Sequence, residues 1–177
     1  MTIYSRASRR ICLRVEALDN FINVARKAYR FDEGRSDVEH GTAHPFDERN
    51  VHPDIAKVSK NLFDNGHYAQ ATFEAFKLVD KRIQRLSKRN ESGVKLMMKA
   101  FNENKPIIQL TDLASQTSKD EQEGYKFMFS GSVMAIRNPR GHEPGMSENP
   151  SQCLDYLGLA SLLLRRVEMP SVKFCTS

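Results

Sequence analysis

Cysteine is scarce in this sequence of 177 residues, which contains three: Cys12, Cys153 and Cys175. An odd number of widely separated cysteines forms neither a disulfide framework nor a zinc-ligand pattern. The sequence therefore predicts a chain of the reducing cytoplasm. Nothing in it indicates a metal or a cofactor.

Long apolar segments are also missing. The longest near-continuous apolar run, residues 157–164, is stopped by Arg165 and Arg166, whereas a bilayer-spanning helix needs about 20 residues. No apolar segment follows the basic residues near the start before Glu16 and Asp19, so we expect no secretory signal. The absence of acidic residues from the first 15 leaves a transit peptide as the alternative. We expect no membrane association.

The charge excess is small, because 27 Lys and Arg residues face 22 Asp and Glu residues, for a formal net charge of +5. It is unevenly placed: residues 77–89 hold six basic residues and one acidic residue, Asp80. A solvated helix face explains a cluster of this size, and a polyanion-binding face is the alternative.

Repeats, low-complexity tracts and an alternation of strands with helices are all absent. Apolar residues recur instead at helical spacing. Residues 13–29 form a predicted helix, 31–51 a polar linker, and a composition shift lies near residue 50. After it we expect five helices, at residues 53–64, 67–88, 93–101, 118–138 and 150–167. The short apolar run 106–110 fits a strand or a loop.

The predicted architecture is an all-α bundle of about five helices over residues 50–170, preceded by a segment, 1–49, with one further helix, and followed by a tail, 171–177. Ser118 and Glu121 match a capping box that would start the fourth helix. Pro139 should stop that helix near Asn138. The last helix is apolar nearly all round, which predicts burial on more than one side, with a second subunit as one partner.

The segment 137–143 is the best site candidate. It combines Arg137, Arg140, His142 and a carboxylate, while Pro139 fixes a turn. Arginine binds phosphate in bidentate fashion and histidine transfers protons near neutral pH, so the set suits phosphodiester chemistry. On composition alone a helix C-terminus with dipole-complementing basic residues is the simpler explanation.

Other candidates are weaker. Three histidines near a loop (His40, His44 and His52) match no standard metal-ligand spacing. His67 and Tyr68 open a helix and suit either a structural role or the lining of a cleft. Cys153 fits a small core residue better than a nucleophile.

Arg137, four residues and His142 match the Arg-x(4–6)-His motif of the HEPN superfamily, whose members are small helical domains. A wider set of residues carries a second resemblance: His52-Pro53, Leu62-Phe63, Gly66-His67-Tyr68-Ala69, Phe73-Glu74-Ala75-Phe76, Leu96-Met97, Phe101, Glu121-Gln122-Glu123-Gly124, Phe129, Gly131, Ala135-Ile136-Arg137-Asn138-Pro139-Arg140-Gly141-His142 and Leu159-Ala160-Ser161-Leu162-Leu163. Over residues 50–168 the chain resembles the bacterial family labelled hypothetical Ymh, itself placed in the HEPN group.

The resemblance implies a metal-independent endoribonuclease. Arg137 would contact the scissile phosphate, and His142 would act as acid or base while the 2′-hydroxyl attacks, leaving a 2′,3′-cyclic phosphate. Asn138 and Arg140 would bind substrate. It further implies RNA as partner, a homodimer, and a cytoplasmic role in phage defence or as a toxin, with a regulatory partner protein left open.

The chain also departs from the family pattern. Glu143-Pro144 follows His142, so the sequence lacks the His-x-Tyr ending of the toxin branch. Many HEPN domains are non-catalytic. The alternatives are therefore a helical module that binds RNA, nucleotide or a protein, and a dimerisation domain without a ligand.

Overall fold

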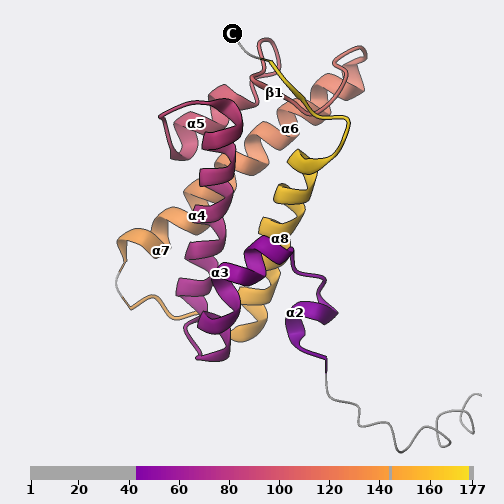
Figure 1. The fold of residues 1–177 in the computed structure, drawn as a ribbon. Coiled ribbons are helices and arrows are strands. Elements are labelled where there is room, and N and C mark those ends of the chain that lie inside the picture. Colours follow the sequence, from indigo (N-terminus) through magenta and orange to yellow (C-terminus); the bar gives the residue numbers. More distant parts are fainter. Residues whose placement is uncertain (1–42, 144, 176–177) are drawn as a thin grey trace, which may run out of the picture. The chain divides into compact units, whose positions relative to one another are not determined.

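Helices dominate residues 43–143 and 145–175, which are the residues that the computed structural model describes (Figure 1). They are α2 (Pro45–Glu48), α3 (Pro53–Asp64), α4 (Tyr68–Ser87), α5 (Gly93–Ala100), α6 (Gln116–Ser132), a π-helical turn (Val133–Arg137), α7 (Asn138–His142) and α8 (Pro150–Glu168). The predicted all-α class is confirmed. The predicted helix 13–29 lies outside the described residues, and the domain boundary at residue 49 stays a prediction.

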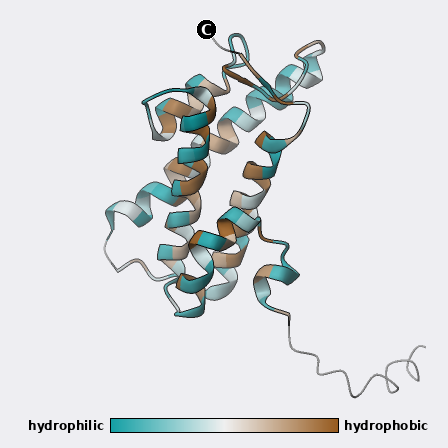
Figure 2. Cartoon of the chain, viewed as in Figure 1, coloured by the Kyte–Doolittle hydropathy of each residue, from teal (hydrophilic) through white to brown (hydrophobic). Residues whose placement is uncertain are grey.

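The core is built around α4, which packs against α3, α5, α7, α8 and the π-helical turn. Its buried apolar positions, Ala71, Ala75, Phe76, Val79 and Ile83, follow the helical period. Figure 2 shows hydrophobic residues gathered along the inward faces of the helices. None of the described helices is both long and apolar enough to cross a membrane.

Two of the predicted helix starts are confirmed with their caps. Pro53 opens α3 behind His52, and Pro150 opens α8 behind Asn149, whose side chain accepts from the Gln152 amide. The predicted start of α6 is wrong, because the cap is Ser115 and its capping-box partner is Ser118. The Ser118 hydroxyl accepts a hydrogen bond from the backbone N–H of Ser115 at 3.0 Å. Ser118 is therefore the third helical residue of the capping box and not the N-cap.

The predicted helix stop near Asn138 is also wrong, because the chain stays helical through Pro139 to His142. The reason is the π-helical turn before it. In this turn the Asn138 N–H bonds to the Val133 carbonyl, five residues back. The wider turn accommodates a residue that cannot donate and whose ring would clash with an α-helical backbone.

The run 106–110 contains a strand. Strand β1 (Ile108–Gln109) pairs antiparallel with β2 (Lys173–Phe174), so the segment expected as a tail joins the fold. Buried Gln122 holds this end in place. Its side chain accepts from the Leu110 N–H and donates to the carbonyls of Phe101 and Ile108.

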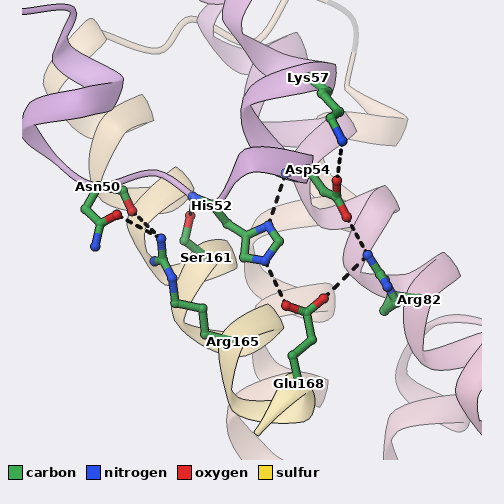
Figure 3. A network of polar contacts seen from close by, with 8 residues as sticks. All are labelled: Asn50, His52, Asp54, Lys57, Arg82, Ser161, Arg165 and Glu168. Atoms are coloured by element: carbon green, nitrogen blue, oxygen red, sulfur yellow. Dashed lines mark hydrogen bonds and ion pairs between the residues drawn. The ribbon is translucent and has the colours of Figure 1, made fainter.

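A polar clasp, made by His52, Asp54, Arg82 and Glu168, joins the start of α3 to α4 and to the end of α8 (Figure 3). His52 Nδ1 accepts from the Asp54 N–H at 3.1 Å, so Nε2 carries the proton that faces Glu168 at 2.9 Å. Arg82 bridges Asp54 and Glu168. The hydrogen bond from Lys57, with Arg82 nearby, holds the pKa of Asp54 below its ordinary value.

Candidate functional site

The Arg-x4-His segment begins at the last residue of the π-helical turn and ends at the last residue of α7. α7 packs against α4 through Gly141, where an added Cβ would lie 2.8 Å from Cε2 of Phe73. The glycine therefore permits a close approach of the two helices. Single π-helical turns within α-helices occur frequently at functional sites.

Arg137 is half-buried and lies against the same aromatic ring, its Cζ 5.6 Å from the Phe73 centroid. It donates from Nη1 to Oδ1 of Asn138 at 3.1 Å. Its buried Nε finds no hydrogen-bond partner, and no carboxylate among the described residues pairs with it. The positive charge is therefore held in place by neutral groups and remains available to an anion.

His142 is exposed and forms no hydrogen bond or ion pair within the described part of the chain. An exposed imidazole without a partner in the protein is accessible to a bound ligand. Side chains five residues apart on an α-helix point about 140° apart. Arg137 and His142 thus share one short segment, but the backbone does not aim them at one point.

Arg140 has a different environment from Arg137. Its Nε lies 2.6 Å from Oε2 of Glu148, its Nη1 donates to the Ile136 carbonyl, and its Cζ lies 4.5 Å from the Tyr156 centroid. The side chains of Arg140 and Glu148 are 6% and 0% exposed. This buried ion pair ties α7 to the segment that leads into α8.

Thr72 on α4 completes the arrangement by donating to Oε1 of Glu148 at 2.6 Å. Beside it lies Cys153, buried in α8. Burial raises the pKa of the Cys153 thiol to about 11. A thiol of that kind is protonated at neutral pH and is a poor nucleophile.

An open cavity of about 510 Å³ lies next to the segment. Its wall combines the start of α4 with the loop after α7: Gly66, His67, Tyr68, Ala69, Gln70, Arg140, Glu143, Gly145, Met146, Ser147 and Glu148. The sequence suggested either a structural role or the lining of a cleft for His67 and Tyr68, and in the structure both line this cavity. Glu143 brings a carboxylate beside His142.

The histidines weighed as metal ligands have structural partners where they are described. His44 and His52 each precede a proline and accept the backbone N–H two residues on, as helix caps. His40 lies outside the described residues. Among the described residues, no group of three or more His, Cys, Asp and Glu side chains is placed to hold a metal ion.

The sequence singled out Arg137, Asn138, Arg140 and His142. The structure brings Arg137 and Asn138 into contact, turns Arg140 toward Glu148 and leaves His142 apart. Sequence reasoning missed Phe73 and Glu148, which hold the segment in place. The one usable signal was Gly141, a small residue opposite an aromatic-rich helix, whereas nothing local marks Glu148 as a partner of Arg140.

Comparison with known proteins adds one match. A family model described as "Protein of unknown function (Hypoth_ymh)" covers residues 49–167. No curated protein and no solved structure matches the chain.

Proposed function

The chain belongs to the Hypoth_ymh family, and for this member we propose a metal-independent endoribonuclease of the HEPN type. The observation that carries the proposal is the contrast between two arginines of one segment. Arg140 is neutralised inside the fold, whereas Arg137 faces no carboxylate among the described residues and stands five positions before the solvent-exposed His142 in the same segment. A cation without a carboxylate partner and a solvent-exposed imidazole are the two kinds of group that metal-independent phosphodiester cleavage uses.

In the proposed reaction His142 accepts the proton of an RNA 2′-hydroxyl. The 2′-oxygen forms a bond to the adjacent phosphorus, and the bond from phosphorus to the 5′-oxygen breaks. A second acid protonates the leaving 5′-oxygen, and a 2′,3′-cyclic phosphate remains. Arg137 stabilises the negative charge that builds on the phosphoryl oxygens, and Asn138 orients Arg137 through the bond between their side chains.

Arg140 has a positioning role in this proposal. We assign to it the positioning of α7 through Glu148, rather than the direct substrate contact expected from the sequence. Breaking a buried ion pair by removing one partner destabilises a protein by about 3–5 kcal/mol. Loss of Arg140 should therefore lower stability as well as cleavage.

We infer a homodimer from an apolar stripe on α6 and the π-helical turn: Gly124, Phe127, Gly131 and Met134. These positions are three, four and three residues apart, so they share one helix face. Phe127 and Met134 are 53% and 59% exposed, and a Cβ added at Gly124 or Gly131 would meet nothing within 4 Å. Glycine weakens a helix by about 1 kcal/mol relative to alanine, so two on an open face suit the close approach of another helix.

A dimer would explain how the site can work although Arg137 and His142 of one chain do not point toward one place. The stripe runs into the turn that ends at Arg137, so pairing along it would bring two copies of the segment near each other. The second copy's His142 then supplies the acid for the leaving oxygen. The HEPN resemblance extends the proposal to phage defence or a toxin-like role in the bacterial cytoplasm, with a regulatory partner protein.

The reaction class is tested with a mixed RNA pool incubated in EDTA, beside the same sequences fully 2′-O-methylated. We expect cleavage of the unmodified pool alone, because the methylated strand lacks the nucleophile. Cleavage of both pools would overturn the proposed chemistry. If the protein binds RNA through Arg137 but cuts neither pool, the result would support a non-catalytic binding module.

A further inference from the structure

A groove lies where the C-terminal end of α4, α5 and the β1–β2 pair come together. Two hollows of about 730 and 430 Å³ share Arg89, Ile107 and Cys175 in their walls, so they form one continuous surface, named here the basic groove. Figure 1 shows α5 and β1 at the end of α4 opposite to α7. Arg85 lies twelve residues after Phe73 on α4, about 18 Å at 1.5 Å per residue. The basic groove is therefore separate from the Arg137–His142 segment.

The walls of the basic groove carry five cationic residues and no acidic one: Arg85, Lys88, Arg89, Lys99 and Lys105. Lys99, one of these five, forms an ion pair with Glu91. Within the described part of the chain, Arg85, Lys88 and Lys105 have no acidic partner. A surface with this charge attracts a polyanion over several ångströms.

Apolar groups lie between these cations. Phe174 on β2 is 48% exposed and Met98 on α5 is 37% exposed, and Ile107 lies in both hollows. An exposed aromatic side chain in a cationic groove is the arrangement on which the bases of a single strand stack. An acidic protein segment would use the cations but would gain little from an exposed phenyl ring.

We propose that the basic groove binds single-stranded RNA flanking the bond that is cut. This inference rests on the proposed ribonuclease function and adds a second contact point to it. Because the groove lies about 18 Å along α4 from the segment, substrates must extend several nucleotides beyond the cut. Residues 77–89, which appeared in the sequence as one basic cluster, divide accordingly: Arg82 belongs to the clasp, whereas Arg85 and Lys88 face RNA.

Binding is measured with the His142→Ala protein and a fluorescent single-stranded RNA of about 20 nucleotides. Lys88→Ala/Lys105→Ala should weaken binding about tenfold near 0.1 M salt and reduce the log–log salt slope by about 1.4, for two lost phosphate contacts. Phe174→Ala should weaken binding without changing that slope, and Phe174→Trp should retain it. The control Lys60→Ala/Lys119→Ala removes the same charge from exposed positions elsewhere. Equal binding by the groove and control variants would overturn the inference.

Cleavage separates this inference from the function on which it rests. In proteins that retain His142, the groove substitutions should increase KM for long RNA and leave kcat unchanged. The same variants should cut a dinucleotide as fast as the protein with an unmutated groove. An unchanged KM for long RNA would refute the groove and leave the nuclease standing. RNA binding in the groove without cleavage of any RNA would refute the nuclease. If poly-glutamate displaces the RNA and binds the groove more tightly than RNA does, the groove would be reassigned to an acidic protein partner.

Discussion

Gly141 is the one described glycine at which an added Cβ would come closer than 3 Å to another atom. A Cβ there would lie 2.8 Å from the Phe73 ring, which also lies under Arg137. Gly141→Ala should therefore push the ring or α7 aside and reduce kcat/KM for RNA about tenfold, the effect of a displaced catalytic group. Steady-state cleavage kinetics measure kcat/KM, and urea unfolding of the same samples measures the free energy of unfolding.

The matched control is Gly158→Ala in α8, where an added Cβ meets nothing within 4 Å. This variant should keep full activity and gain about 0.5–1 kcal/mol of stability from better helix propensity. Full cleavage by Gly141→Ala would show that α7 is not fixed by its contact with Phe73.

The two described cysteines should differ sharply in reactivity. Burial raises the pKa of Cys153 to about 11, so its reactive thiolate forms only as the pH rises toward that value, whereas Cys175 is exposed. Alkylation of the native protein at pH 8, mapped by mass spectrometry, should modify Cys175 and spare Cys153. Rapid modification of Cys153 would contradict its placement between Thr72 and the Tyr68 carbonyl.

Residue identity alone could not separate the two arginines of the segment. Arg137 and Arg140 stand three positions apart with the same chemistry, yet one meets Asn138 and the other meets Glu148. Which arginine is neutralised depends on how the loop after α7 folds back. That loop has no periodicity, so no sequence pattern places Glu148 opposite Arg140.

At the level of secondary-structure elements, the clasp predicts a stability difference between two histidine caps. His52→Ala removes the α3 cap and leaves Glu168 with Arg82 alone, so we expect a loss of about 1–2 kcal/mol in the free energy of unfolding. His44→Ala removes the cap of α2 and the contact of Nε2 with Asp64, and it should lose less, because this pair is more exposed than His52–Glu168 and α2 has only four residues. Urea titration measures both. Equal losses would contradict the clasp, and His52→Asn should recover part of the stability by restoring a capping acceptor.

The five helices expected after residue 50 are present, but α2 (Pro45–Glu48) was missed: it lies in the predicted polar linker, and its Phe46 is buried in the core. Both ends of the fourth predicted helix were also placed wrongly. The starts of α3 and α8 carry strong local signals, a proline preceded by a capping residue. The start of α6 was missed because several Ser and Thr residues offer competing caps between Ser115 and Ser118. The continuation through Pro139 was missed because a π-helical turn shifts hydrogen bonds without changing the apolar pattern.

For the whole molecule, the apolar stripe predicts a dimer that depends on α6. Phe127→Ser/Met134→Lys should convert a dimer into monomers and lower RNA cleavage about tenfold or more, since each site then lacks its second histidine. Leu162→Ser alters an exposed leucine of α8, the helix that the sequence suggested as the face for a second subunit. If the stripe on α6 forms the interface instead, this control variant should remain dimeric. Sedimentation velocity reports the state directly. A fully active monomer of the unmutated protein would contradict the dimeric site.

The central claim is that His142 cuts RNA without a metal. The most direct test incubates an RNA pool in EDTA with the unmutated protein, with His142→Ala and with His44→Asn, which changes another histidine but retains a capping acceptor. The account predicts new 2′,3′-cyclic phosphate ends from the unmutated protein and His44→Asn, and none from His142→Ala. Equal cyclic ends from all three proteins, or none from any, would contradict it.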